Sequence, residues 1–167
     1  MQNYSFDPDY LRDKYRQERD KRLREDGNDQ YQEVSGDFSY FVDDPYISEA
    51  IERQALTDSY EIVIIGGGFG GVLAASRLKE AGFSDFKIIE KGGNFGGTWY
   101  WNRYPGASCD IESYIYFPLL EETKFIPRKK YTNASETLEY FDVISEKFGL
   151  NEHAIFQTEV NDVRWKD

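Results

Sequence analysis

The chain has 167 residues, enough for one domain with an appendage. Its 40% hydrophobic and 17% aromatic content excludes wholesale disorder, and its formal net charge of −11 argues against nucleic acid or an anionic membrane as partner. The single cysteine, Cys109, excludes an internal disulfide framework, and the sequence shows neither a membrane span nor a secretory signal. We therefore expect a cytoplasmic protein with no membrane or nucleic-acid partner.

Residues 1–59 form a polar, tyrosine-rich extension. Asp7 and Pro8 are typical of a helix start, and the mixed charges that follow predict a helix that ends at Gly27. Its apolar stripe is too thin for an independent helix, so we expect it to lie on the surface of a larger body. Residues 31–50 place aromatic rings among acids, which indicates an arm that docks by its rings, with a partner-binding motif as the alternative.

The second predicted domain, residues 60–167, opens with an apolar strand that runs into a glycine motif. The strand, over 61–65, leads into G-x-G-x-x-G and then a helix over 72–81. A second strand over 86–90 ends on an acid, Glu90. This is a complete βαβ dinucleotide-binding unit in about thirty residues. A flexible glycine loop is the alternative, and the flanking elements disfavour it.

Each feature of this unit has a physical role toward a dinucleotide. Gly66 permits a tight turn, Gly68 lets the backbone approach a pyrophosphate, and Gly71 allows the helix to pack closely on the strand. The phosphates would sit at the helix N-terminus, where free N–H groups and the helix dipole favour negative charge. Glu90 would accept hydrogen bonds from an unphosphorylated ribose, which leaves both FAD and NAD open and disfavours NADP.

A long glycine- and aromatic-rich segment follows Glu90, over residues 91–120. Loops between the strands of such a sheet are normally short. The glycines allow backbone freedom, while Trp99, Tyr100 and Trp101 offer large flat surfaces. This combination suits a wall against a planar ring system, and a locally packed loop without a ligand is the alternative.

The remainder of the chain predicts one more helix and a third strand. Asn133 and Glu136 form a capping-box pattern, and Gly149 ends the helix. Residues 154–160 alternate like a strand, and we expect His153 to lie in the loop before it. No cluster with the spacing of metal ligands is present in the sequence.

The three predicted strands indicate an α/β fold: a Rossmann-like domain with an incomplete three-layer, doubly wound parallel sheet. Such a sheet normally has about five or six strands with both faces covered, so we expect an open edge and uncovered apolar residues. Cys109 has no histidine near it in the sequence. We expect it to be a packing residue and not a nucleophile.

Residues 96–113, GGTWYWNRYPGASCDIES, closely resemble a motif of the flavin-dependent Baeyer–Villiger monooxygenases. The extension, with DPDYLRDKYRQERDKRLREDGN and FVDDPY, resembles the subgroup that acts on large cyclic or polycyclic ketones. The resemblance thus covers nearly the whole chain. It implies FAD as the bound cofactor, NADPH as co-substrate, and a ketone and O2 as partners of the full-length enzyme.

The resemblance also implies roles for individual residues. Contacts with FAD are implied for Gly66, Gly68, Phe69, Gly70, Gly71, Glu90, Gly97, Thr98, Trp99, Tyr100, Trp101, Asp110, Tyr116 and, near the adenine, Val160. Ser108, Cys109 and Asp110 fall where the nicotinamide cofactor approaches, although Ser108 stands where several relatives have arginine. Asp110 is implied as the catalytic residue, a buried carboxylate that positions an arginine from later in the sequence.

Two hypotheses follow for the function. In the first, the chain is the FAD-binding N-terminal portion of an NADPH-dependent monooxygenase that uses O2 to convert ketones to esters or lactones. Family members are several times longer, so this hypothesis expects the chain alone to be inactive and to need the missing C-terminal portion. In the second, the chain is a non-catalytic or truncated nucleotide-binding module. A related flavin N-hydroxylase or FAD/NAD reductase is a further alternative, which the tryptophan motif, residues 96–113, disfavours.

Overall fold

The computed structural model describes residues 6–32 and 34–166 of the chain. It contains two compact units, Met1–Asp43 and Asp44–Asp167. The predicted boundary near residue 60 is therefore not where the units divide, because residues 44–59 pack within the second unit. Within the described ranges, no helix combines the length and the apolar character needed to cross a bilayer.

The first unit is built around helix α1, Pro8–Asp20, and two short 3-10 turns, η1 (Gly27–Gln30) and η2 (Gly36–Val42). The predicted helix start is confirmed, since the Asp7 carboxylate accepts hydrogen bonds from the N–H groups of Asp9 and Tyr10. The predicted end at Gly27 is wrong. None of the residues of α1 is buried, and the helix ends at Asp20, where its last turn is capped by Lys21.

The second unit contains the predicted parallel sheet, with strands β1 (Ile62–Ile65), β2 (Phe86–Ile89) and β3 (Ala154–Ile155) in the order β1-β2-β3. The third strand is shorter than predicted. Gln157 has a φ of +51°, which turns the chain out of the extended conformation just after β3. The alternating pattern of the sequence therefore extends beyond the strand, which ends at Ile155.

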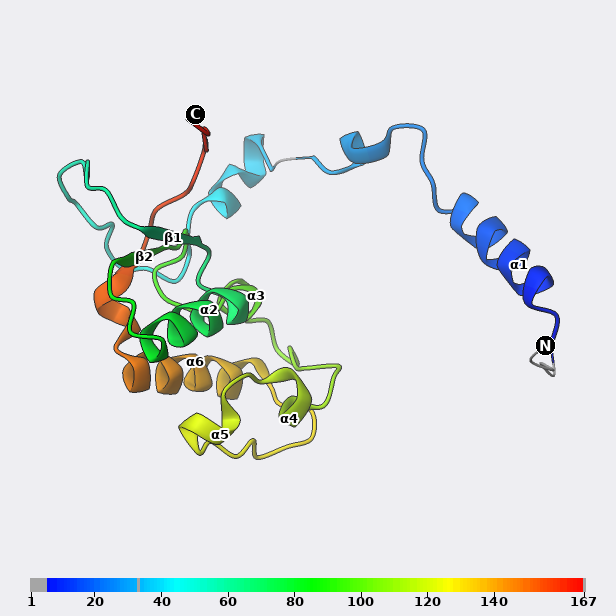
Figure 1. The fold of residues 1–167 in the computed structure, drawn as a ribbon. Helices are drawn as coiled ribbons and strands as arrows, with labels where there is room; N and C mark the ends of the chain where they lie inside the picture. Colours follow the sequence, from blue (N-terminus) through cyan, green and yellow to red (C-terminus); the bar gives the residue numbers. More distant parts are fainter. Residues whose placement is uncertain (1–5, 33, 167) are drawn as a thin grey trace. The chain divides into compact units, whose positions relative to one another are not determined.

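Two long helices cover one face of the sheet. Helix α2 (Phe69–Glu80) lies between the sheet and helix α6 (Ala134–Phe148), and contacts both (Figure 1). Helix α2 begins at Phe69, earlier than predicted. The core between these layers is made of fully or almost fully buried side chains, namely Val72, Ala75, Phe86, Ile88, Phe141 and Ile144.

Helix α6 shows one half of the predicted capping box. The Asn133 side chain accepts a hydrogen bond from the Glu136 N–H at 3.0 Å, which caps the helix as predicted. The Glu136 carboxylate instead accepts from the backbone N–H of Arg128 at 2.7 Å. Gly149 ends the helix in the left-handed conformation, with φ +63°, as predicted.

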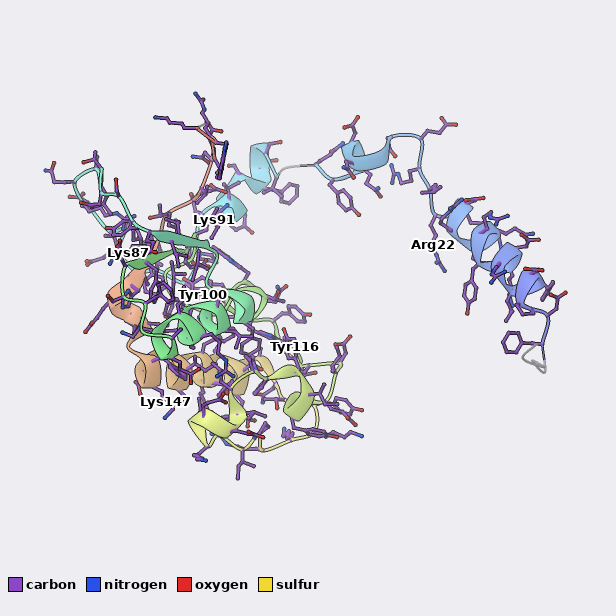
Figure 2. All side chains as sticks on the ribbon, viewed as in Figure 1. Arg22, Lys87, Lys91, Tyr100, Tyr116 and Lys147 are labelled. Atoms are coloured by element: carbon purple, nitrogen blue, oxygen red, sulfur yellow. The ribbon has the colours of Figure 1, made fainter. Side chains whose placement is uncertain are left out.

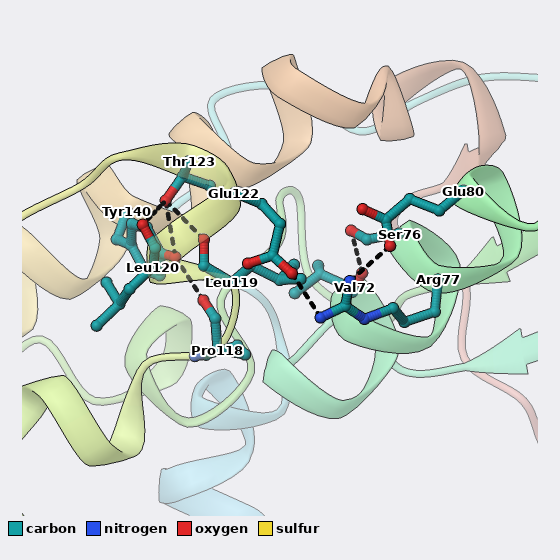
Figure 3. Close-up of polar contacts among 10 residues, drawn as sticks. All are labelled: Val72, Ser76, Arg77, Glu80, Pro118, Leu119, Leu120, Glu122, Thr123 and Tyr140. Carbon is teal, nitrogen blue, oxygen red and sulfur yellow. Dashed lines mark hydrogen bonds and ion pairs between the residues drawn. The ribbon is translucent and has the colours of Figure 1, made fainter.

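Short helices complete the second unit: α3 (Thr98–Trp101), α4 (Ser113–Tyr116), α5 (Leu120–Thr123) and the 3-10 turn η3 (Leu150–His153). Figure 3 shows how polar contacts join α5 to the long helices. The buried Tyr140 of α6 donates its hydroxyl to the carbonyl of Pro118 and contacts the Thr123 hydroxyl, while Arg77 of α2 pairs with Glu122 at 2.6 Å.

His153 is not in a loop, contrary to the prediction. It ends η3, and its ring stacks on Phe86 of β2 with centroids 4.1 Å apart. Its Nδ1 lies 3.1 Å from the Phe86 carbonyl oxygen, and its Nε2 lies 3.3 Å from the Lys79 ammonium. These two contacts are satisfied when Nδ1 carries the proton and Nε2 accepts, so His153 serves as a packing residue between α2 and β2.

The contact between Gly71 and Gly66 can be tested by substitution. In Gly71→Ala the added Cβ would lie 1.9 Å from the Gly66 carbonyl oxygen, so we expect a loss of about 3 kcal/mol in unfolding free energy. Gly70→Ala is the matched control, because it lies in the same helix and a Cβ there meets nothing within 4 Å. The control should be neutral or more stable by about 0.5–1 kcal/mol. Equal urea midpoints for the two variants would contradict the close helix–strand contact.

Candidate cofactor-binding site

The loop after β1 has the geometry that the glycine motif predicts. Gly66 adopts φ +95°, a conformation that favours glycine, and donates its N–H to the Ile89 carbonyl at 2.8 Å. Gly71 packs α2 against this turn with no room for a side chain. The first turn of α2 therefore starts directly at the carboxyl end of β1, where its N–H groups have no partner within the helix.

A second glycine loop lies against the first. The Gly96 N–H donates to the Gly67 carbonyl at 3.0 Å. Gly97 has φ +52°, and a Cβ there would be 2.8 Å from the Gly68 Cα. The two backbones can approach this closely because Gly97 has no side chain.

Glu90 joins the two loops. Its side chain is 5% exposed, and its two carboxylate oxygens accept N–H bonds from Gly67 at 2.5 Å and from Gly92 at 2.6 Å. The predicted ribose acceptor thus lies at the carboxyl end of β2, beside the first glycine loop. Each carboxylate oxygen can accept more than one hydrogen bond, so these contacts leave acceptor capacity for a ligand hydroxyl.

A pocket of about 420 Å³ lies beside the second glycine loop. This volume is within the range of ligand pockets, roughly 300–1,000 Å³. Six predicted site residues line it, namely Thr98, Trp99, Ser108, Cys109, Asp110 and Tyr116. The structure thus brings together residues from α3, from α4 and from the segment between them.

The two large aromatic side chains of the pocket are joined to each other. The Trp99 indole N–H donates to the Tyr116 hydroxyl at 3.2 Å, and the rings meet edge to face, with centroids 6.2 Å apart. Tyr116 also contacts the ring of Phe69, at the start of α2, at 5.2 Å between centroids. The pocket wall is therefore connected to the glycine loop through ring contacts.

Tyr100, Trp101 and Val160 were predicted beside the cofactor, but they do not line this pocket. Tyr100 is 2% exposed, and its hydroxyl donates to Asp44 at 2.5 Å and accepts from the Gly93 N–H at 2.9 Å. Trp101 contacts the Tyr100 ring edge to face. Figure 2 labels Tyr100 and Tyr116, which come from α3 and α4 respectively.

Cys109 is 5% exposed and packs in the core, in keeping with the prediction of a packing residue. Burial raises the pKa of its thiol, which makes it a poor nucleophile at neutral pH. The Cys109 N–H donates to the Thr132 carbonyl at 2.8 Å, and the adjacent Ser108 pairs with Asn133. These backbone bonds fix the direction of Asp110, the next residue in the chain.

Asp110 is exposed in this structure, and its burial beside the flavin and an arginine from later in the sequence stays a prediction for the complete enzyme. It lines the pocket without a charged partner in the region described, and solvent can stabilise its charge. No three His, Cys, Asp or Glu side chains within residues 6–32 and 34–166 come together in a way that could hold a metal ion.

Sequence reasoning missed the residues that hold Tyr100 in place. Asp44 and Tyr46 lie before the predicted domain boundary, yet they contact α3. Arg103, within the tryptophan motif, places its guanidinium over both Tyr46 and Tyr100. The aromatic and acidic pattern of residues 31–50 was the available signal, since it predicted docking by rings without naming a partner.

Comparison with known proteins decides the family. Residues 64–139 match the model of an NAD(P)-binding Rossmann-like domain. A Baeyer–Villiger monooxygenase of Streptomyces coelicolor is 43% identical over 157 residues, which is 94% of this chain and 26% of that protein. Pentalenolactone D synthase of Streptomyces exfoliatus is 47% identical, over 94% of this chain and 26% of its own length. The chain belongs to the Baeyer–Villiger monooxygenase family.

Solved structures of this family agree with the fold. The polycyclic ketone monooxygenase of Thermothelomyces thermophila superposes with a TM-score of 0.79 at 40% identity, covering 95% of this chain and 27% of that one. A steroid monooxygenase bound to NADP gives a TM-score of 0.55 at 35% identity, over 60% of this chain and 20% of that one. This chain thus spans about a quarter of the length of the curated relatives it matches.

The buried Tyr100 hydroxyl gives a test at alkaline pH. Burial, and then the hydrogen bond with Asp44, raises the pKa of Tyr100 from 10 to about 12. The folded chain therefore holds this proton more tightly than the unfolded chain, and the associated stability is lost as the pH rises from 10 toward 12. We expect the unfolding free energy of Tyr100→Phe to fall less steeply between pH 10 and 12 than that of the unsubstituted chain.

Urea unfolding at several pH values measures this slope. Tyr31→Phe is the control, because Tyr31 is 78% exposed, and it should keep the slope of the unsubstituted chain. A Tyr100→Phe variant with that same slope would show that Tyr100 is not held as the structure has it.

Proposed function

We propose that this chain forms the FAD-binding portion of a Baeyer–Villiger monooxygenase. The observation that carries the proposal is the contact of two glycine loops beside Glu90, next to a pocket lined by aromatic residues. The family to which the chain belongs, and relatives solved with FAD and NADP, support it. The activity of the whole enzyme, which converts a ketone to an ester or lactone with NADPH and O2, is part of the proposal.

The residues present fit FAD. The glycine-rich backbone from Gly66 to Gly71 at the start of α2 suits a pyrophosphate, because free N–H groups and the helix dipole favour negative charge there. Glu90 suits the hydroxyls of an unphosphorylated ribose and would repel a 2′-phosphate. The Trp99–Tyr116 pair offers flat apolar surface for the flavin ring.

The chemistry would be divided between cofactor and protein. When bound, FAD would supply electron transfer from NADPH and the activation of O2. Trp99 and Tyr116 would orient the ring system, and their hydrogen bond would keep both side chains in one arrangement. Asp110 would orient a cationic group from the rest of the enzyme near the reacting centre, with Ser108 and Cys109 on the approach of NADPH.

The substrate class and the location complete the proposal. A large or polycyclic ketone is supported by the likeness to the polycyclic ketone monooxygenase, which includes the extension before residue 60. A cytoplasmic location is supported by the single buried cysteine, since the chain needs no oxidising compartment.

Flavin binding tests the proposal directly. We expect the chain to quench the fluorescence of added FAD and to bind FAD at least about 10-fold more tightly than FMN, because FMN lacks the adenosine half that the glycine loops and Glu90 would hold. A folded chain that binds neither flavin, or that binds both equally, would overturn the assignment of this cradle to FAD.

Gly97→Ala tests the contact between the two loops. The added Cβ would lie 2.8 Å from the Gly68 Cα, so we expect FAD affinity to fall by about 10-fold or more. Gly82→Ala is the matched control, because Gly82 also has a positive φ, +86°, but a Cβ there meets nothing within 4 Å. It also places alanine at a positive φ, without the clash, and should bind FAD like the unsubstituted chain. Equal loss in both variants would argue against a role for the loop contact.

A further inference from the structure

A segment that precedes the nucleotide-binding unit is hydrogen-bonded, at both of its ends, to residues that follow β2 and β3. We call residues 44–53 the strap. At its first end, Asp44 Oδ2 accepts hydrogen bonds from the Tyr100 hydroxyl at 2.5 Å and from the Gly93 N–H at 3.0 Å. Asp44 Oδ1 accepts from the N–H of Tyr46 at 2.9 Å. One carboxylate thus holds three groups, and the bond to a buried hydroxyl is of the strong, charge-assisted kind.

Rings and a cation reinforce this end of the strap. The Arg103 guanidinium lies 4.0 Å from the Tyr46 ring centroid and 4.5 Å from that of Tyr100. The two rings meet edge to face at 5.6 Å, and Arg103 Nε donates to the Tyr100 carbonyl at 2.8 Å. The cation therefore interacts with both aromatic faces and with the backbone of α3.

The second end of the strap holds the chain just after β3. The Ile51 N–H donates to the Gln157 side chain at 2.8 Å, and Arg53 donates to the Phe156 carbonyl at 3.1 Å. The Gln157 N–H in turn donates to the Gly92 carbonyl at 3.0 Å. Both ends of the strap are thus connected to the loop that contains Gly92 and Gly93, Asp44 directly and Ile51 through Gln157. The Glu90 carboxylate accepts a hydrogen bond from Gly92 in the same loop.

The wall of the pocket needs such support. Helix α3 has only four residues and cannot be stable by its own hydrogen bonds. Trp99 lines the pocket, whereas the adjacent Tyr100 is bonded to the strap. Whatever fixes Tyr100 therefore also fixes the backbone that carries Trp99, because the two residues share one short helical turn.

We propose that Asp44 and Tyr100 are positioning residues for the cofactor site, through which the strap holds α3 and the loop at Gly93 in their binding arrangement. The proposal rests on the proposed function, since the site that is positioned is the FAD site. Within the described part of the chain, the hydrogen bonds and ring contacts of the strap reach Tyr100 and Trp101 but no other residue assigned to the flavin, so its effect reaches Trp99 through α3.

Fluorine NMR tests the positioning without any cofactor. The chain has three tryptophans, Trp99, Trp101 and Trp165, and each gives one signal after labelling with 5-fluorotryptophan. In Asp44→Asn we expect the signals of Trp99 and Trp101 to shift or broaden, while that of Trp165, which is 91% exposed, stays in place. Asp43→Asn, the same change at an exposed neighbour, should leave all three signals unchanged. Unmoved signals of Trp99 and Trp101 in Asp44→Asn would overturn the proposal.

FAD titration of the same variants measures the consequence. Asp44→Asn and Tyr100→Phe should each weaken FAD binding by about 10-fold, and the double variant should lose less than the product of the two single losses, because both changes remove the hydrogen bond between Asp44 and Tyr100. Tyr100→Phe keeps the ring and its contact with Arg103, so it stays informative if Asp44→Asn fails to fold. Additive losses, or FAD binding unchanged in both single variants, would contradict the proposal.

The two proposals fail in different ways. Absence of FAD binding by the unsubstituted chain would overturn the FAD assignment, while the fluorine signals would still report whether the strap orients Trp99. Normal FAD binding by the unsubstituted chain together with normal binding by Asp44→Asn would overturn the strap's role and leave the FAD assignment intact.

Discussion

The Glu90 carboxylate is the group on which the arrangement of the second unit depends. It is buried at the carboxyl end of β2 and accepts N–H bonds from Gly67 and Gly92, one in each of the loops that flank it. A carboxylate is stable in such a place only because its oxygens are hydrogen-bonded. Its backbone also joins β3, through the Glu90 N–H to the Ile155 carbonyl at 3.0 Å. The ends of β2 and β3 and the two glycine loops therefore meet at one residue.

The glycines around Glu90 make this meeting possible. A Cβ at Gly67 would lie 3.1 Å from a Glu90 carboxylate oxygen and 2.8 Å from the Phe95 ring, and one at Gly92 would lie 2.8 Å from the Tyr100 ring. The glycine loops are thus packed as tightly as the core of a protein, although glycine contributes only backbone atoms to these contacts. A site of this kind is rigid before a ligand arrives, which lowers the conformational cost of binding.

Much of this arrangement could be predicted from local sequence. The strand before the motif, the turn at Gly66, the close packing at Gly71 and the Asn133 cap each depend on a few neighbouring residues, and the structure confirms them. Six of the predicted site residues also line one pocket, and five of them come from the motif at residues 96–113. The predicted uncovered apolar residues are present too, since Val63 and Ile65 of the edge strand are about half exposed.

Three of the errors have a common physical cause, which is that each depends on a distant partner. Residues 154–160 alternate like a strand, yet the backbone turns at Gln157, where its N–H bonds to Gly92. His153 was predicted in a loop, because nothing in its neighbourhood shows that its ring will stack on Phe86. Residues 44–59 were assigned to the extension, although they pack with the second unit.

The sequence by itself determined the βαβ unit, its acid and the family, because glycine spacing and the tryptophan motif are local and specific. Only the tertiary structure decided which aromatic residues face the pocket. Trp99 and Tyr100 are adjacent and chemically similar, so the local sequence does not indicate which of the two lines the pocket. The Tyr100 hydroxyl is hydrogen-bonded to Asp44, a residue 56 positions away, whereas Trp99 lines the pocket. Side-chain direction in so short a helix follows its long-range partners and not its own sequence.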